Sequence, residues 1–137
     1  MTRSEERARH DHPVQRAYAT PDTDVVVRRG LKAPMRDGVV LAADAHLPAR
    51  NGQPLTERVP ALLTRTPYDK RAPGHEARAA FFAKHGYAVV VQDVRGRYAS
   101  EGEFYPFRNE AEDGFDTVEW VAAQPWCDGQ VGMLGES

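Results

Sequence analysis

Two short apolar runs, at residues 61–63 and 87–91, constrain the fold of this chain more than any other feature. The first reads Ala-Leu-Leu and the second Tyr-Ala-Val-Val-Val. Near-continuous apolar runs of this length are typical of strands buried on both faces, as in a parallel sheet that helices cover. Parallel strands need a crossover between them, and residues 73–85 have the composition of a helix that stops at Gly86. The runs therefore predict an α/β fold with right-handed crossovers.

Two helices and a further strand are expected around the second run. Four residues of the helix predicted over residues 73–85 should lie on one stripe of its surface. That stripe contains Ala77, Ala80, Phe81 and Lys84. The second helix is predicted to begin at Asn109, where Asn109 and Glu112 resemble a capping box, and to end at Gln124-Pro125. Its apolar face is predicted to contain Ala111, Phe115, Val118 and Ala122. A strand over residues 131–134 follows, and counting along the chain makes it the fifth strand.

An antiparallel hairpin is predicted ahead of these elements. Residues 25–31 and 39–47 have the pattern of strands, and the Asp-Gly pair at 37–38 between them is a strong hairpin signal. The second of these strands alternates apolar residues with Asp44 and His46. This alternation predicts an antiparallel strand with one face buried and the other face wet.

The length and the N-terminal composition predict the domain organisation. With 137 residues, the chain has room for one domain with a modest core. Residues 1–22 are expected to form a flexible polar arm, and residues 23–137 to form the N-terminal portion of a catalytic domain. Residues 48–60 are rich in Pro, Gly and Asn and are expected to be a loop.

Charge and hydropathy argue against several classes of function. The chain has 18 Lys and Arg against 20 Asp and Glu, a net charge of −2, which gives no signature of nucleic-acid binding and no basic face for a membrane. No apolar run approaches the length of a membrane span, and the first residues lack the apolar core of a signal peptide, so a cytoplasmic protein is expected. The single Cys excludes an internal disulfide framework. The five His form no metal-ligand pattern, and no dinucleotide or phosphate-binding motif follows a strand.

The last residues combine an apolar strand with a Gly-x-Ser turn. Gly135-Glu136-Ser137 is the first half of the Gly-x-Ser-x-Gly nucleophile elbow, in which a serine lies on a strained turn between a strand and a helix. In this α/β-hydrolase plan the oxyanion hole also uses a group from the loop after the third strand. That loop is predicted at residues 64–70, where Pro67 fixes the backbone before the hydroxyl donor Tyr68. The alternative is a surface tyrosine that packs on its neighbours.

Two arginines follow the second apolar run. Arg95 and Arg97 lie within residues 92–104, after the carboxyl end of a strand, where ligands collect in open α/β sheets. One interpretation is that both arginines bind an anion. The other is that Asp93 and Arg95 hold the loop through ion pairs and hydrogen bonds.

Several stretches together resemble the N-terminal part of the CocE/NonD hydrolases, the group that includes cocaine esterase, α-amino-acid ester hydrolases and X-Pro dipeptidyl-peptidases. They are residues 34–39 (PMRDGV), 65–70 (RTPYDK), 92–102 (QDVRGRYASEG), 126–129 (WCDG) and 131–137 (VGMLGES). The stretches occur in the family's order and cover most of residues 30–137. This combination is specific, whereas one stretch alone would not be.

The resemblance implies a serine hydrolase with an α/β-hydrolase fold. It implies that Ser137 is the nucleophile and that the Tyr68 hydroxyl stabilises the oxyanion. The triad Asp and His follow the serine in this family, so the chain is expected to be an N-terminal fragment that is inactive by itself. No metal or organic cofactor is implied, and the expected substrates are small-molecule esters, amides or short peptides.

Two other functions stay open at this point. One is an X-Pro dipeptidyl-peptidase, and the other is a non-catalytic α/β-hydrolase-like binding protein. The acyl pocket of this family is built mainly by residues outside the stretches above, so the sequence leaves the substrate open. It also leaves the oligomeric state open.

Overall fold

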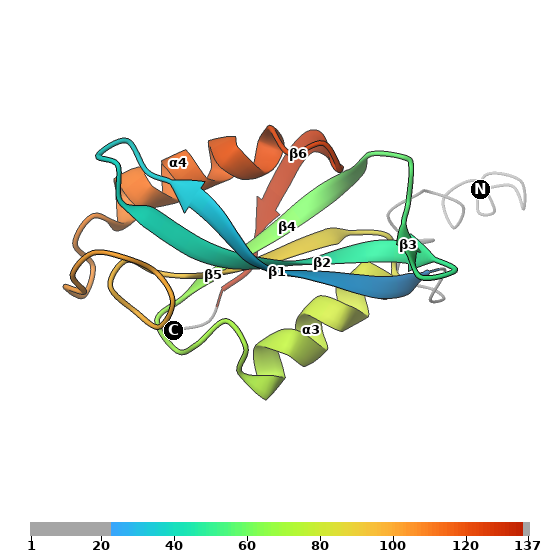
Figure 1. The fold of residues 1–137 in the computed structure, drawn as a ribbon, viewed down its shortest axis with the longest axis horizontal. Coiled ribbons are helices and arrows are strands. Elements are labelled where there is room, and N and C mark those ends of the chain that lie inside the picture. The colour runs from blue at the N-terminus through green and yellow to red at the C-terminus, as the bar shows by residue number, and fades with distance from the viewer. Residues whose placement is uncertain (1–22, 136–137) are drawn as a thin grey trace, which may run out of the picture.

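Within residues 23–135, which the computed structural model describes, six strands form one mixed sheet in the order β1-β2-β5-β4-β6, with β3 paired to β2. The strands are β1 (Asp24–Pro34), β2 (Val40–Arg50), β3 (Gln53–Pro54), β4 (Val59–Thr66), β5 (Ala88–Asp93) and β6 (Cys127–Met133). The helices are α3 (Pro73–Lys84) and α4 (Glu110–Ala122). Figure 1 shows the two helices on opposite sides of the sheet, so the domain has three layers. The predicted arm, residues 1–22, lies outside the described part of the chain.

The two apolar runs form the parallel centre of the sheet, as predicted. β4 pairs in parallel with β5 on one side and with β6 on the other. Leu63 and Val90 point toward α4 and share a buried cluster with Val121. Their neighbour Val89 points the other way and packs against Ala79 of α3. Because successive strand residues face opposite sides, each run must be apolar throughout to fill both cores.

The predicted hairpin is also confirmed. β1 and β2 are antiparallel, and the turn closes through hydrogen bonds between Met35 and Val39 and from the Gly38 N–H to the Met35 carbonyl. Gly38 has a φ of 86°, a conformation that glycine adopts without strain. The loop predicted over residues 48–60 was partly wrong, because β2 continues to Arg50 and the short β3 pairs with it. The strand before the Gly-x-Ser turn is therefore the sixth and not the fifth.

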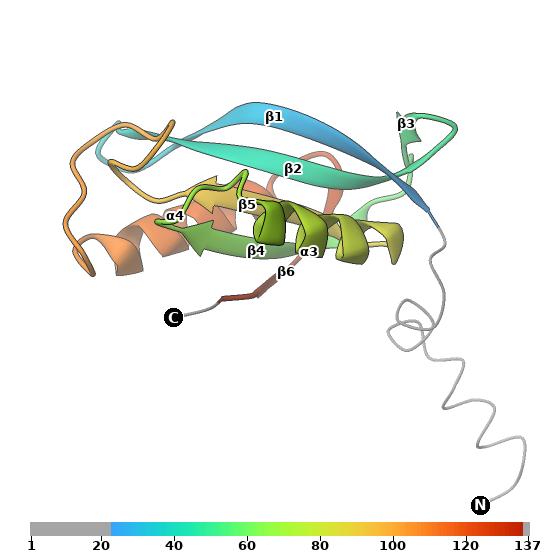
Figure 2. The same ribbon diagram turned by 90° about the horizontal axis from the view of Figure 1, so that it is seen from below.

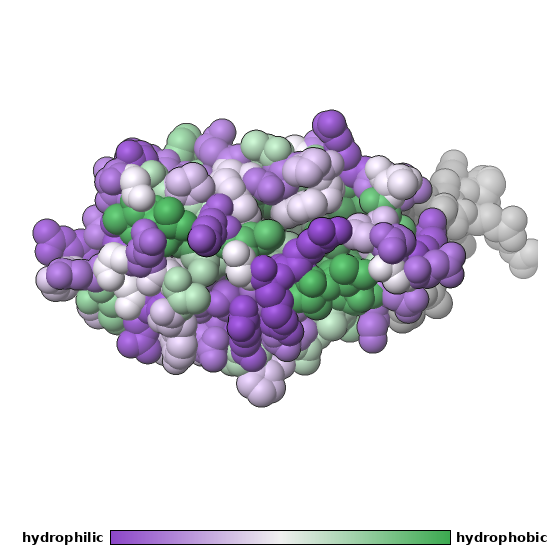
Figure 3. All heavy atoms as spheres, viewed as in Figure 1, coloured by the Kyte–Doolittle hydropathy of each residue, from purple (hydrophilic) through white to green (hydrophobic). Residues whose placement is uncertain are grey.

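β1 is an edge strand of the sheet and carries exposed charged side chains. Arg28, Arg29 and Lys32 are all exposed on it. Figure 3 shows hydrophilic side chains crossing the middle of the face on which β1 lies, between separate apolar patches. Charged residues on an edge strand oppose pairing with a second sheet.

The wet face predicted for β2 was wrong. Asp44 is fully buried and His46 is 2% exposed. The Asp44 carboxylate accepts hydrogen bonds from Gly30 N at 3.0 Å, Arg29 Nη1 at 3.1 Å and Arg71 Nε at 3.1 Å. Burial alone would raise the pKa of Asp44, but the hydrogen bond from Arg71 and the other donors outweigh it and lower the pKa. Polar residues that alternate along a strand can thus be buried where charged partners from other elements reach them.

The buried faces of both helices also differ from the prediction. In α3 the buried residues are Ala79 and Ala83, whereas Phe81 of the predicted stripe is 49% exposed. In α4 the buried residues are Asp113, Thr117 and Val121, whereas Phe115 is 61% exposed. The polar members of the α4 face have partners in the sheet: Asp113 binds Arg95, and Thr117 Oγ1 donates to Gln92 Oε1 at 3.0 Å.

The predicted capping box at the start of α4 was wrong as well. Asn109 occupies the N-cap position, but it has a left-handed φ of 66° and its side chain makes no capping hydrogen bond. The acidic residues of the first turn instead bind arginines from elsewhere. The pairs are Glu110 with Arg65, Glu112 with Arg36, and Asp113 with Arg95.

Candidate active site

The loops that follow β4 and β5 leave the sheet at the same end, the carboxyl end of its parallel strands. β4 and β5 run in parallel and end opposite each other at Thr66 and Asp93. Figures 1 and 2 both show the two loops at this end of the sheet. β6 reaches the same end, where Leu134 N donates to the Leu63 carbonyl at 2.9 Å. Carboxyl ends of parallel strands are where open α/β sheets bind ligands.

Tyr68 lies in the loop after β4 and is open to solvent. Its side chain is 62% exposed, and its hydroxyl makes no hydrogen bond within residues 23–135. Its backbone N–H donates to Thr66 Oγ1 at 2.9 Å. The backbone at Tyr68 is thus fixed by the strand end, while the hydroxyl is left available as a donor.

A buried ion pair anchors the Tyr68 loop to β5. Lys70 Nζ lies 2.8 Å from Asp93 Oδ2, with the two side chains 3% and 0% exposed. The backbone N–H of Lys70 donates to the other carboxylate oxygen at 2.8 Å, and Ala99 N donates to Oδ2 at 3.3 Å. Asp93 therefore connects the loop after β4 with the loop after β5.

Two further contacts restrain the same loop. Arg97 Nε donates to the Pro67 carbonyl at 3.0 Å. The Asp69 carbonyl lies 2.9 Å from His75 Nδ1 of α3, and Asp69 has a left-handed φ of 81°. A non-glycine residue in this conformation is held there by its surroundings.

The loop after β5 is built on Arg95 and Gly96. Arg95 donates to Asp113 at 2.8 and 2.9 Å and to Asp37 at 2.8 and 3.2 Å. The hydrogen bond from Arg95 holds the pKa of Asp37 below its usual range, and the bonds to Asp113 and Asp37 raise the pKa of Arg95. Of the two interpretations of this loop, the structural one is confirmed for Asp93 and Arg95.

Gly96 permits a close crossing of the loop over itself. It has a φ of 73°, and a Cβ added there would overlap Phe104 N and Glu103 C. No other residue could let the two segments approach so closely. The crossing sets the position of Phe104 beside Arg97.

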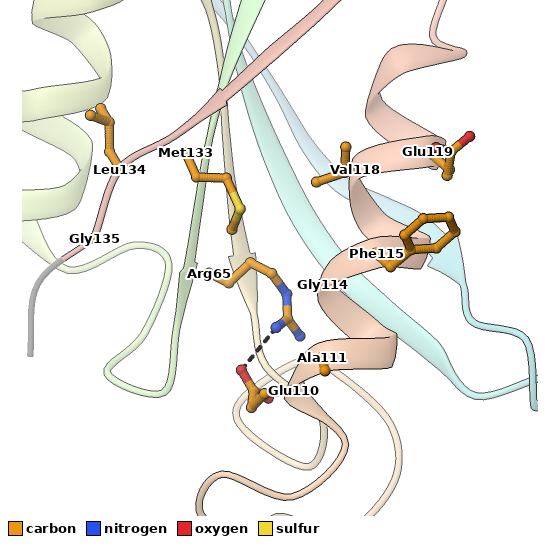
Figure 4. Close-up of a pocket in the computed structure, with 10 residues that line it drawn as sticks. All are labelled: Arg65, Glu110, Ala111, Gly114, Phe115, Val118, Glu119, Met133, Leu134 and Gly135. Atoms are coloured by element: carbon orange, nitrogen blue, oxygen red, sulfur yellow. Dashed lines mark hydrogen bonds and ion pairs between the residues drawn. The ribbon is translucent and has the colours of Figure 1, made fainter.

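Arg65 separates two cavities at this end of the sheet. Its side chain is 6% exposed; Nη1 lies 2.8 Å from Glu110 Oε2 and Nε donates to Gln92 Oε1 at 2.7 Å. On one side is a groove of about 640 Å³ between α4 and β6, into which Met133 points (Figure 4). On the other side is a cavity of about 480 Å³, the Tyr68 cavity. It is lined by Arg65, Pro67, Tyr68, Val94, Arg97, Phe104, Pro106, Phe107 and Glu110.

Left-handed backbone is concentrated in the two loops that contribute residues to the Tyr68 cavity. Within the described residues, five non-glycine residues have positive φ, and four of them lie in the loops after β4 and β5. They are Asp69, Tyr98, Phe107 and Asn109. Strained backbone of this kind concentrates at ligand-binding and catalytic sites.

Ser137 and Glu136 lie outside the described residues, so the nucleophile stays a prediction. The structure brings the Tyr68 loop to the end of the sheet at which β6 ends, two residues before Gly135. Sequence reasoning missed Lys70 and Arg65. The signal that could have suggested the pairing of Lys70 with Asp93 is an acidic residue at the end of one buried strand and a basic residue in the loop that follows the neighbouring strand.

Comparison with known proteins supports this reading of the fold. The chain is 44% identical over 120 residues to cocaine esterase of Rhodococcus sp. (strain MB1 Bresler), a match that covers 85% of this chain and 20% of that protein. The structure of an α-amino acid ester hydrolase is similar with a TM-score of 0.63 and 34% identity, over 81% of this chain and 21% of that one. A CocE/NonD family hydrolase from Staphylococcus aureus shares the fold with a TM-score of 0.69 at 23% identity, over 80% and 22% of the two chains.

The chain spans about one fifth of the length of the curated relatives it matches. None of the helices between residues 23 and 135 is long and apolar enough to cross a membrane. The family model of the X-Pro dipeptidyl-peptidases (S15 family) matches residues 37–137, which is most of the chain. The fold is that of the N-terminal part of an α/β hydrolase, and the chain belongs to the X-Pro dipeptidyl-peptidase (S15) family, among its CocE/NonD-like hydrolases.

Proposed function

We propose that residues 1–137 belong to a serine hydrolase that cleaves ester or amide bonds of small molecules through an acyl-enzyme. The observation that carries this proposal is the exposed Tyr68, which lies on a restrained loop at the end of the sheet where β6 also ends. A donor must be held in advance at the place where negative charge develops if it is to favour the transition state over the substrate. The contacts of the neighbouring residues fix the backbone of the Tyr68 loop, which supports this role for Tyr68.

In the proposed mechanism Ser137 attacks the substrate carbonyl while its proton passes to the base. The bond to the alcohol or amine then breaks, this leaving group takes the proton, and water hydrolyses the acyl-enzyme to the acid and free Ser137. The Tyr68 hydroxyl donates to the oxyanion, a contribution of about 2.7–4 kcal/mol for a well-aimed donor. A His and an Asp from outside residues 1–137 serve as the base and its orienting partner. The described histidines have other surroundings: His46 is buried in β2, His75 Nδ1 lies 2.9 Å from the Asp69 carbonyl, and His85 Nδ1 lies 2.7 Å from the Phe81 carbonyl.

Esters are the first choice of substrate because the relatives described above at 44% and 34% identity are an esterase and an ester hydrolase. A second candidate is an X-Pro dipeptidyl-peptidase, which the description of the matching family model favours. The two functions are separated by comparing kcat/KM for an aryl ester with kcat/KM for an Ala-Pro anilide.

We also propose that the protein is located in the cytoplasm.

A fluorophosphonate probe tests the serine-hydrolase proposal on the full-length protein that contains these residues. We expect labelling of the full-length protein at Ser137, lost in Ser137→Ala. A polypeptide of residues 1–137 is expected to stay unlabelled, because no base accepts the serine proton. An unlabelled full-length protein would favour the non-catalytic binding protein, and labelled residues 1–137 would contradict the need for a base from elsewhere.

A further inference from the structure

Within residues 23–135, the Tyr68 cavity contains one cation that has no carboxylate partner. Arg97 lines the cavity, and no carboxylate lies within ion-pair distance of it among residues 23–135. Its Nε is bound to the Pro67 carbonyl at 3.0 Å. Both terminal nitrogens of its guanidinium are left without hydrogen bonds in the described part of the chain.

The other charges of this region are neutralised. Arg65 and Glu110 line the same cavity and bind each other at 2.8 Å. Arg95, two residues before Arg97, is shared by Asp37 and Asp113. Among the residues that the structure describes, the cavity therefore carries one positive charge without a carboxylate partner.

Aromatic rings hold the Arg97 guanidinium in place. It lies 5.3 Å from the centroid of the Tyr98 ring and 5.1 Å from that of Phe104. Tyr98 has a left-handed φ of 50°, and Phe104 is placed by the crossing at Gly96. A guanidinium fixed by stacking and by one hydrogen bond loses little entropy when it binds a carboxylate through its two free nitrogens.

The remaining walls of the cavity are apolar and aromatic. Pro67, Val94, Phe104, Pro106 and Phe107 supply them. A volume of about 480 Å³ is within the range of small-molecule sites and accommodates a substituted phenyl ring. An apolar cavity with one convergent cation suits an aromatic group that ends in an anion.

We propose that the Tyr68 cavity is a substrate subsite in which Arg97 selects an aromatic substituent that ends in a carboxylate. This inference rests on the proposed function and deepens it. The preferred substrates are esters or amides whose acyl part or alcohol part carries a carboxyphenyl group. Arg97 binds the carboxylate, and the ring lies against Phe104 and the neighbouring apolar walls.

Two pairs of esters test the inference on the full-length protein and distinguish the two parts of the substrate. For the acyl part, 4-nitrophenyl 4-carboxyphenylacetate is compared with its 4-methyl analogue. For the alcohol part, 4-carboxybenzyl butyrate is compared with 4-methylbenzyl butyrate. The quantity measured is the ratio of kcat/KM for the anionic and the neutral ester of each pair.

Arg97→Leu is expected to lower this ratio by about 10- to 100-fold in one of the two pairs, mainly through KM, as loss of a charge-assisted hydrogen bond predicts. The ratio cancels any general loss from the missing contact with Pro67. Arg108→Leu is the matched control, because Arg108 stacks on Tyr105 in the same loop but does not line the cavity. Its ratios should equal those of the wild type, and unchanged ratios in Arg97→Leu for both pairs would overturn the inference.

A binding measurement separates this inference from the proposed function. Calorimetry with 4-methylbenzoate and its neutral amide should show preference for the anion in the wild type and none in Arg97→Leu. If the wild type hydrolyses no ester but binds the anion through Arg97, the proposed function fails and the subsite stands. If it hydrolyses the esters with no dependence on Arg97, only the subsite fails.

Discussion

Lys70→Met should test whether the buried ion pair below the Tyr68 loop is needed for stability and for turnover. The substitution keeps an apolar stem of similar length but removes the ammonium that lies 2.8 Å from Asp93 Oδ2. Removal of one partner of a buried pair costs about 3–5 kcal/mol, because the other charge stays buried without compensation. Since two backbone N–H groups, from Lys70 and Ala99, still bind the carboxylate, we expect about 3 kcal/mol, the lower end of that range.

Denaturant unfolding of the full-length protein measures the loss, and kinetics on an aryl ester measures its effect on the site. We expect kcat to fall by about tenfold or more with a smaller change in KM, because a looser Tyr68 loop weakens transition-state binding more than substrate binding. Lys84→Met is the control, since Lys84 is exposed on α3 and its replacement should change stability by no more than about 0.5 kcal/mol.

The double variant Lys70→Met/Asp93→Asn sharpens the test. The side-chain amide introduced by Asp93→Asn carries no charge, and its oxygen could still accept the backbone N–H of residue 70. The double variant should therefore be more stable than Lys70→Met alone. A loss below about 1 kcal/mol in Lys70→Met, or a double variant less stable than the single one, would refute the reasoning from uncompensated charge.

Three further results are expected. Tyr68→Phe should lower kcat for an aryl ester about 10²- to 10³-fold in steady-state kinetics. Tyr105→Phe, 49% exposed in the loop after β5 and not part of the Tyr68 cavity, should stay within about threefold, and equal effects would remove Tyr68 from the mechanism. Gly96→Ala should destabilise the protein by more than about 1 kcal/mol in thermal unfolding, because the added Cβ overlaps the backbone at Phe104. An unchanged Tm would contradict the close crossing of the loop at Gly96. Burial lowers the pKa of His46 in the folded state, so below about pH 6.5 the unfolded state binds a proton more readily and stability falls as pH falls. His46→Gln should flatten this dependence of stability on pH between about pH 6.5 and 5. An unaltered slope would exclude His46 as its source.

The sheet could be predicted from local patterns because the relevant signals are local. Apolar runs at β4 and β5 and the Asp-Gly turn between β1 and β2 each depend on adjacent residues. The position of the Tyr68 loop followed from the order of the strands, since the loop after a parallel strand must lie at the carboxyl end of the strands. These expectations required no knowledge of side-chain partners.

The helix faces and the anchoring pairs could not be predicted because their causes are distant in sequence. Asp113 is buried in α4 only because Arg95, 18 residues earlier, binds it. The same holds for Lys70 and Asp93, which are 23 residues apart and meet only when β4 and β5 are paired. Residue spacing on a helix identifies stripes, but it does not say which stripe faces the sheet when polar residues find partners there.

The order of strands in the sheet also bears on how the chain is made. β4 gains one neighbour, β5, soon after its own synthesis, but its other neighbour, β6, ends at Met133, well after β4 ends at Thr66. At ribosomal rates of about 5–20 residues per second, the roughly 70 residues between them take about 3–14 s to emerge. During that interval one side of β4 has no pairing partner, and an unpaired strand edge is a site for association with other chains. Nascent chains stalled before β6 should therefore depend on chaperones more strongly than chains stalled after it.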